Sequence, residues 1–261
     1  RYLFGLFLAS IILFLLIPYF FDYEKRSEIF KKYLEENYNF KITCGKKIQA
    51  QNVAEHSLGL LLSITRRLSN LRGNLKPIEI FDKKTLIVGA GGIGCQIAKM
   101  LNPFGTSISF VVRNLNRKKI SYIKKYFLIK DLRKIILNFD IVINTLPLTE
   151  KTKEIFDKKV FKSMKKKTIF ICVSRSQTIN KKDLMSFVKK NKFFGVGIDD
   201  TGNFYNEKNI SLYKKNNIVI TKHQAGQTDN TSRREELSLS NIERFFKNKK
   251  LKNLVSKKFQ Y

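Results

Sequence analysis

The chain has 261 residues, 43% of them hydrophobic, and a formal net charge of +30 at pH 7 from 51 Lys and Arg against 21 Asp and Glu. Length and apolar content predict folded, globular structure with one large domain or two modest ones, and they argue against disorder. The charge invites nucleic acid or an anionic membrane as a partner. The lysines, however, occur as short scattered runs without a nucleic-acid-binding motif, so we favour solvated lysine-rich faces over a polyanion partner.

The reactive side chains are few. Cys44, Cys95 and Cys172 form no Cys-x-x-Cys pair, and the only histidines are His56 and His223. This set suggests neither a disulfide framework nor a zinc site, and we expect no metal. A reducing compartment, the cytoplasm, fits the cysteine usage.

The start of the chain is apolar. Residues 2–21 carry no charge, while Arg1 precedes them and Asp22 follows. A segment of this length can span a bilayer as a helix, which would make it a membrane anchor. Pro18 followed by aromatic residues is also typical of a buried strand and its exit loop. Because the chain begins with Arg rather than Met, we expect the sequence to be truncated, and membrane association stays open.

Helices and strands alternate after about residue 53. Residues 53–68 follow an apolar helical pattern, and a loop with Gly73 and Pro77 comes next. Helices alternating with short β-branched runs predict an α/β fold with a parallel sheet covered on both faces. The expected strands are residues 85–88, 107–112, 140–144, 168–172, 194–198 and 218–221. The other expected helices are residues 93–101, 118–126, 132–137, 158–164, 181–189 with Asn180 as N-cap, and 232–246.

A Gly-x-Gly-x-x-Gly motif directly follows the first of these strands and opens a helix. Gly89 permits the tight turn, Gly91 lets the backbone approach a pyrophosphate, and Gly94 lets the helix pack close to the strand. The helix N-terminus supplies free N–H groups and partial positive charge to the phosphates. The context favours dinucleotide binding over glycines that serve only a tight turn. The expected phosphate contacts are Gly89, Gly91, Gly92, Ile93 and Gly94.

The end of the second strand distinguishes the two nicotinamide cofactors. An acidic side chain there would bind the ribose hydroxyls of NAD and repel a 2′-phosphate. Here the strand ends in Arg113 and Asn114, with Arg117 and Lys118 shortly after and no acid. Arg113 could pair with a 2′-phosphate, so NADP is slightly favoured over NAD, although Arg is common in so basic a chain.

Several further stretches lie at the ends of expected strands or open a helix. They are Asn-Val-Ala-Glu-His at residues 52–56, Leu-Pro-Leu-Thr at 146–149, Val-Ser-Arg at 173–175, Gly-Val-Gly-Ile-Asp at 195–199 and Thr-Lys-His-Gln-Ala-Gly at 221–226. With the glycine loop, and in this order, they resemble the D-isomer-specific 2-hydroxyacid dehydrogenases over residues 53 to about 245. The resemblance implies a Rossmann-type doubly wound parallel sheet with a flavodoxin-like substrate domain.

The same resemblance divides the chain. Residues 1–52 are interpreted as the C-terminal remnant of a partial substrate domain, residues 53–225 as the NAD(P)-binding domain, and residues 226–261 as a C-terminal helix that returns to the substrate domain. Because the second half of residues 2–21 can be the last buried strand of that domain, the anchor hypothesis for this segment loses weight. Family likeness also leads us to expect a homodimer formed through the linker helix after Asn52.

The resemblance implies roles at the site. Arg175 would hold a substrate carboxylate with its two-pronged guanidinium. His223 would donate a proton to the carbonyl oxygen as hydride arrives, and Asp199 would hydrogen-bond the nicotinamide carboxamide. The alternatives are that Arg175 is a surface base and His223 a structural imidazole. The other expected cofactor contacts are Leu146, Pro147, Val173 and Ser174.

One carboxylate of the family's site is missing. The family has a glutamate five residues after the aspartate, where it bonds the catalytic histidine; that position is Phe204 here. Glu207 is the nearest acid that could take over the role, since Asp200 should point to the opposite side of the strand from Asp199. Loss of a charge-assisted hydrogen bond of about 1.5–3 kcal/mol would slow turnover about tenfold to a hundredfold.

The favoured function is hydride transfer between NAD(P)H and a small 2-oxo acid such as glyoxylate or hydroxypyruvate. The main alternative is a catalytically weakened NAD(P)-binding sensor or relic of the same family, which Phe204 and the short first domain favour. Retention of Arg175 and His223 disfavours it. A third hypothesis is a membrane-tethered NAD(P)-binding protein, which requires residues 2–21 to be a true span.

Overall fold

The computed structural model describes residues 43–45, 48–68, 76–200, 202, 204, 206–230 and 232–255, without the side chain of Glu207. The apolar segment 2–21 and most of the expected substrate-domain remnant lie outside the described residues. Within the described part, no helix is long and apolar enough to cross a membrane.

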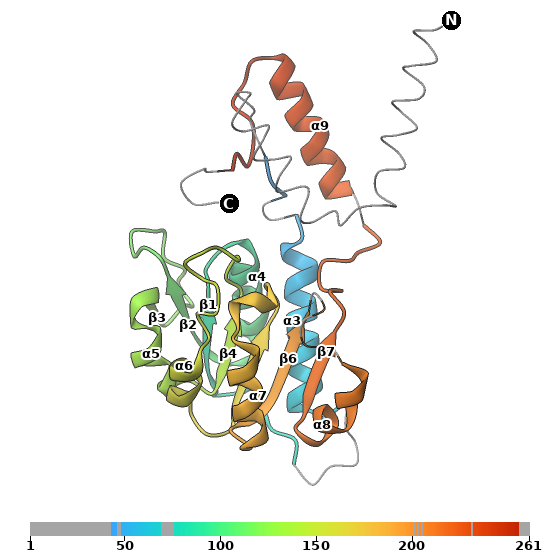
Figure 1. The fold of residues 1–261 in the computed structure, drawn as a ribbon. Helices are drawn as coiled ribbons and strands as arrows, with labels where there is room; N and C mark the ends of the chain where they lie inside the picture. Colours follow the sequence, from blue (N-terminus) through green and yellow to red (C-terminus); the bar gives the residue numbers. More distant parts are fainter. Residues whose placement is uncertain are drawn as a thin grey trace, which may run out of the picture.

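Seven parallel strands form one sheet in the order β3-β2-β1-β4-β5-β6-β7 (Figure 1). The order runs outward in both directions from β1 and β4, which is the doubly wound arrangement that the family resemblance implies. The strands are β1 (Lys84–Val88), β2 (Ser107–Val112), β3 (Lys125–Leu128), β4 (Ile141–Asn144), β5 (Thr168–Cys172), β6 (Phe193–Asp199) and β7 (Ile218–Thr221).

Helices cover both faces of this sheet. The helices α3 and α4 pack together on one face, and α5, α6 and α7 lie on the other (Figure 1). The described helices are α3 (Ala50–Thr65), α4 (Gly92–Leu101), α5 (Leu132–Ile135), α6 (Lys158–Ser163), α7 (Lys181–Lys189), α8 (Ile210–Lys215) and α9 (Ser232–Phe246), and short 3-10 turns follow or precede several of them.

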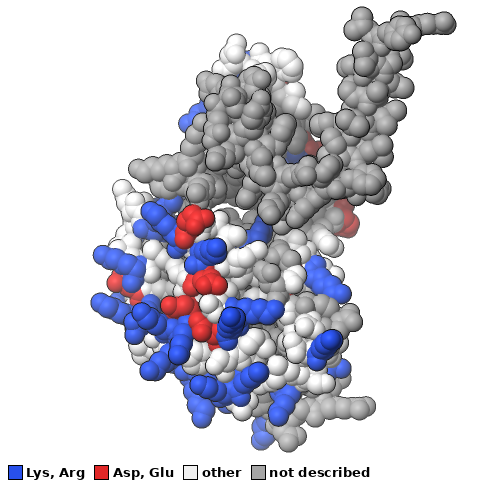
Figure 2. Space-filling view, viewed as in Figure 1, with Lys and Arg blue, Asp and Glu red and all other residues white. Residues whose placement is uncertain are grey.

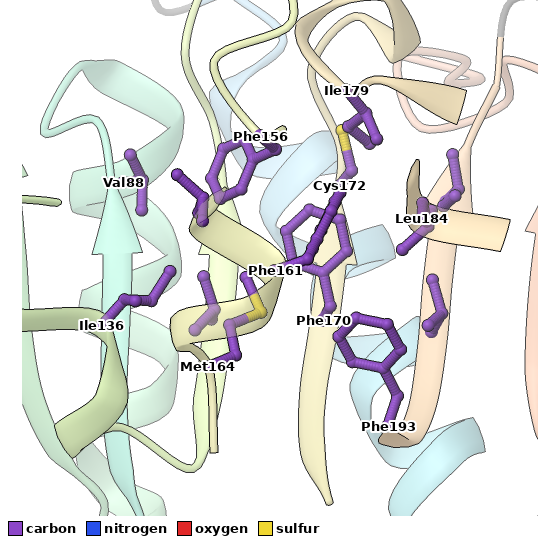
Figure 3. Packing of buried hydrophobic residues seen from close by; sticks show 14 of the residues in the cluster. Val88, Ile136, Phe156, Phe161, Met164, Phe170, Cys172, Ile179, Leu184 and Phe193 are labelled. Carbon is purple, nitrogen blue, oxygen red and sulfur yellow. The ribbon is translucent and has the colours of Figure 1, made fainter. Parts of the chain in front are cut away.

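The central strands are buried on both faces, which explains their uninterrupted apolar sequences. In β1, Leu86 and Val88 face one hydrophobic cluster and Ile87 faces the other. Phe170 of β5 lies 5.1 Å from Phe156, between ring centroids, and 5.6 Å from Phe161 of α6 (Figure 3). The first pair is tilted and the second is edge-on, and edge-on contacts are a favoured geometry for buried aromatic side chains. The resulting core holds the strand ends, and therefore the loops beyond them, in fixed positions.

The predicted helix at residues 118–126 is wrong. Residues 125–128 instead form β3, which pairs with Ser109–Val112 of β2. The Lys124 N–H donates to the Ile108 carbonyl, and the Ile120 N–H donates to the Tyr126 hydroxyl. Lysine favours helices, but partners across the chain satisfy these N–H groups, and a β-prone aromatic pair follows. Tertiary pairing therefore overrides the local preference.

The C-terminal part returns to the segment before α3. Thr43 and Leu254 form an antiparallel bridge, and the Cys44 N–H donates to the Asn253 carbonyl over 2.9 Å. The expected bounds of α9 agree with the observed ones, and α9 lies apart from the sheet (Figure 1). α9 has no buried residue, so it contributes little to the core around the sheet.

Candidate active site

The expected functional residues gather at the carboxyl ends of neighbouring strands. The glycine loop follows β1, Leu146 and Pro147 follow β4, and Arg175 follows β5. Asp199 ends β6, beside Thr221 at the end of β7. In doubly wound sheets this edge, where the strand order reverses, carries the ligand crevice. Sequence positions 89 to 223 thus meet at one edge.

The glycine loop has the geometry that a dinucleotide requires. Gly89 adopts a φ of 108°, and a Cβ at Gly94 would lie 2.0 Å from the Gly89 carbonyl oxygen. The loop therefore needs glycine at both positions for the close approach of α4 to β1. A Cβ at Gly91, by contrast, would meet nothing within 4 Å, which leaves open space at the helix N-terminus. Gly92 and Ile93 begin α4, where backbone N–H groups lack helical acceptors.

Two arginines follow β2, and their surroundings differ. Arg113 and Asn114 are exposed at the strand end. Arg117, which the sequence did not single out, donates from its guanidinium to the Ala90 carbonyl over 3.0 Å and lies 5.8 Å from the centre of the Tyr126 ring. It therefore braces the glycine loop against β3. The sequence did not indicate that Arg117 contacts Ala90 and Tyr126, because no strand was expected at β3.

The loops after β4 and β5 line the next part of the edge. Leu146 is half-buried, its N–H bonds the Asn144 side chain over 3.1 Å, and Pro147 is exposed. Val173 and Ser174 are buried. Arg175 is exposed, and its guanidinium has no hydrogen-bond partner within the described part of the chain. That side chain is available for a carboxylate from solvent.

Asp199 organises the loop after β7. Its carboxylate is 4% exposed, and such a group needs hydrogen bonds to be buried. The Thr221 hydroxyl donates to Oδ1 over 2.6 Å, and the Gln224 N–H donates to the same oxygen over 2.8 Å. The Ala225 N–H donates to Oδ2 over 3.0 Å. The loop that carries His223 is therefore tied to the end of β6.

Both histidines of the chain face this carboxylate. His223 has a φ of 51°, its side chain is 54% exposed, and its Nδ1 lies 3.9 Å from Asp199 Oδ2. His56, on α3, has its Nε2 2.8 Å from the Thr221 hydroxyl and 3.8 Å from Asp199 Oδ1. Burial lowers the pKa of His56, and the negative Asp199 offsets part of that effect. The sequence placed His56 in a motif but assigned it no role.

Phe204 is a core residue. Its ring is buried in the cluster beneath α7, its N–H donates to Asp200 Oδ2, and its carbonyl accepts from the Tyr213 hydroxyl over 2.6 Å. Asp199 and Asp200 therefore bond to different loops, on the two sides of β6. The side chain of Glu207, expected as a substitute, lies outside the described part, although its backbone begins a 3-10 turn, Glu207–Asn209. Among the described residues, no group of His, Cys, Asp and Glu could hold a metal ion.

Known proteins are similar to this chain in sequence and in fold. A glyoxylate/hydroxypyruvate reductase of Arabidopsis thaliana, HPR3, is 29% identical over 220 residues, which cover 77% of this chain and 65% of HPR3. The chain thus spans somewhat less than two thirds of that relative. Among solved structures, an acyclic imino acid reductase, Bsp5, with NADPH and D-Arg has a TM-score of 0.74 at 24% identity, over 85% of this chain and 73% of that one.

A D-isomer specific 2-hydroxyacid dehydrogenase from Xanthobacter autotrophicus Py2, in complex with NADPH and MES, also has a TM-score of 0.74, at 18% identity over 85% of this chain and 94% of that one. At these identities the two structures establish the fold. The family model for the D-isomer specific 2-hydroxyacid dehydrogenase NAD binding domain matches residues 58–225, which are most of the chain and include all seven strands of the sheet. The chain therefore belongs to the D-isomer specific 2-hydroxyacid dehydrogenase family, whose NAD-binding domain it contains.

Proposed function

We propose that the protein is an oxidoreductase that transfers a hydride between NAD(P)H and a small 2-oxo acid. The observation that carries this proposal is the meeting of three features at one sheet edge. They are open space for phosphates at Gly91, the exposed guanidinium of Arg175, and His223 facing the Asp199 carboxylate.

The chain's own residues would bind, orient and protonate the substrate. Arg175 would pair with the substrate carboxylate in a two-pronged contact that turns the 2-oxo group toward the nicotinamide. Bound NAD(P)H supplies the hydride. His223 directs Nδ1 toward Asp199, which leaves Nε2 to donate a proton to the carbonyl oxygen, and in the reverse direction Nε2 takes the hydroxyl proton.

The substrate and cofactor are proposed more narrowly as a glyoxylate- or hydroxypyruvate-like acid and NADP. HPR3, a glyoxylate/hydroxypyruvate reductase, supports the substrate class. The absence of an acid after β2, with exposed Arg113 there, supports NADP, as do NADPH complexes of similar fold. A homodimer, a cytoplasmic location and the three-part division at residues 52 and 225 belong to the same proposal, supported by the family likeness and the three free cysteines.

NADPH oxidation by the purified protein across a panel of short 2-oxo acids tests the proposal. We expect turnover with at least one acid, and His223→Ala should reduce it by about 10²–10⁴-fold because the proton donor is lost. NADPH affinity of the variant, measured by fluorescence, serves as the control for folding. Equal turnover by His223→Ala would remove the proton-donor assignment.

The second candidate function is a cofactor-binding sensor without catalysis. Burial of Phe204 at the family's glutamate position is the observation that favours it. Tight NADPH binding with no turnover of any acid would support this candidate and contradict the oxidoreductase.

A further inference from the structure

The hydrogen-bond capacity of Asp199 is almost filled. A carboxylate offers about four acceptor positions, two on each oxygen. Oδ1 accepts from Thr221 and Gln224, and Oδ2 accepts from Ala225. Counting the described residues alone, the one remaining position is on Oδ2, the oxygen that faces Nδ1 of His223 at 3.9 Å. That distance is too long for a hydrogen bond, but such contacts in ligand-free sites often tighten when substrate binds.

The direction of each proton in this cluster follows from counting donors. Thr221 has a single hydroxyl proton, and it is donated to Asp199 Oδ1. The Thr221 oxygen must therefore accept in its contact with His56, so Nε2 of His56 carries a proton. A continuous donor chain runs from His56 through Thr221 to Asp199. It holds the carboxylate in the orientation that turns Oδ2 toward His223.

The three residues of this hydrogen-bonded series come from elements that are far apart in the sequence. His56 is on α3, Thr221 ends β7 and Asp199 ends β6, and the His56 side chain is only 22% exposed. His223 itself has a φ of 51°, a conformation that costs a non-glycine residue energy and persists only where other contacts impose it. The hydrogen bonds from Gln224 and Ala225 to Asp199 impose it here.

We propose that His56, Thr221 and Asp199 together position His223. They would take over the role of the family's glutamate, which bonds the catalytic histidine and is replaced here by Phe204. Asp199 Oδ2 receives Nδ1–H of His223, and His56 acts through Thr221 as a positioning residue. The inference rests on the proposed function and deepens it. It differs from the expected contact of Asp199 with the nicotinamide carboxamide, because one free acceptor position on Oδ2 cannot serve both groups at once.

Paired substitutions at Thr221 and at His56 give the kinetic test. Thr221→Val removes the hydroxyl at similar volume and Thr221→Ser retains it; His56→Leu removes the donor and His56→Gln retains one at the Nε2 position. We expect Thr221→Val and His56→Leu to lower kcat about tenfold to a hundredfold, with the NADPH Kd changed less than about threefold. Thr221→Ser and His56→Gln should recover most of kcat.

Three kinetic outcomes would overturn the inference. The first is an unchanged kcat in Thr221→Val. The second is an equal loss of kcat in the two variants at each position, and the third is a loss of NADPH affinity without a loss of kcat. Loss of NADPH affinity in Asp199→Asn with kcat preserved would assign the carboxylate to the carboxamide instead.

A spectroscopic measurement keeps the inference testable if the wild-type protein shows no turnover. The chain has only two histidines, so ¹⁵N imidazole resonances can be assigned with His56→Gln alone. At alkaline pH we expect His223 to hold its proton on Nδ1, and Thr221→Val and Asp199→Asn to shift the proton toward Nε2. A His223 that already carries its proton on Nε2 in the wild type would refute the positioning role, whereas missing turnover with the expected spectra would refute only the oxidoreductase.

Discussion

Asp199 is the residue on which the local order of the site depends. Its buried carboxylate is bonded by a side chain of β7 and by two backbone N–H groups of the following loop. Removing such a partner costs more than forming it gains, because the group left behind stays buried. The neighbouring His56 shares this environment, and its protonation should therefore be visible in the stability of the whole protein.

We expect the free energy of unfolding to fall as the pH drops below about 6.5, the pKa of a histidine in an unfolded chain. Burial lowers the pKa of His56 in the folded state, so in that window the unfolded state binds more protons. His56→Gln should flatten this dependence while matching the wild type near pH 8. Urea denaturation between pH 5 and 8 measures it, and an equally steep fall in the variant would contradict the assignment.

Gly94 and Gly91 should respond differently to one added methyl group. Gly94→Ala puts a Cβ 2.0 Å from the Gly89 carbonyl oxygen, and the displacement of α4 should cost about 1–3 kcal/mol of stability or more. Gly91→Ala meets no protein atom within 4 Å, so it should fold like the wild type. Because its methyl group fills phosphate space, NADPH should bind about tenfold to a hundredfold more weakly.

Thermal melts and NADPH titrations of the two variants separate these effects. A Gly91→Ala protein with wild-type affinity would mean that the phosphates do not approach this part of the loop.

At the scale of elements, the strands β2, β5 and β7 and the helices α7 and α9 have the bounds that the sequence predicts. Their signals are local, since apolar runs, the Asn180 cap and Gly positions act within a few residues. The sequence predicts a basic helix over residues 118–126, whose last two residues instead begin β3, and only pairing with β2 makes this segment a strand. The helix α8 (Ile210–Lys215) was likewise not predicted, since its sequence is short and lacks a clear apolar period.

Asn217 joins three elements at the other end of the sheet. It is buried with a φ of 54°, and its Nδ2 donates to the carbonyls of Ile64 in α3 and Phe194 in β6, over 3.2 and 3.1 Å. Asn217→Gly should cost about 1–3 kcal/mol because it removes both side-chain hydrogen bonds, although the Ile64 carbonyl still accepts from the Arg67 N–H. Asn217→Ala should cost about 1–2 kcal/mol more, because alanine tolerates the left-handed conformation poorly. Chemical denaturation compares them, and equal stabilities would show that φ at this position carries no strain.

At the scale of the whole molecule, the net charge of +30 is the dominant property. Figure 2 shows Lys and Arg side chains spread over the visible face of the sheet domain, with fewer Asp and Glu among them. One well-formed pair, Lys165 with Asp140 at 2.8 Å, lies between the start of β4 and the segment before β5. This even distribution of Lys and Arg is expected for solvated lysine-rich faces. That the protein has no nucleic-acid partner stays a prediction.

We expect added NaCl to raise the melting temperature. Like charges repel one another more in the compact state than in the unfolded chain, and salt reduces the Debye length from about 30 Å at 0.01 M to about 3 Å at 1 M. Melting curves from 0.02 to 0.5 M NaCl test this, with choline chloride as a control for specific cation binding. A melting temperature that falls with salt would mean that attractive ion pairs outweigh the repulsion.

The sequence by itself determined the doubly wound sheet, the glycine loop, and the motif positions of Arg175, Asp199 and His223. The parallel sheet and the glycine loop follow from the apolar period and from the steric needs of glycine, which act within a few residues, whereas the doubly wound order and the three motif positions come from the resemblance to the family. Only the tertiary structure brought His56 to Thr221, 165 positions away, and turned Arg117 onto Ala90. Such contacts depend on how helices pack on the sheet and on which strands pair. Both involve residues that are far apart in the sequence, so short sequence patterns do not predict them. The sequence could therefore locate the missing glutamate at Phe204, whereas the carboxylate proposed in its place required the fold.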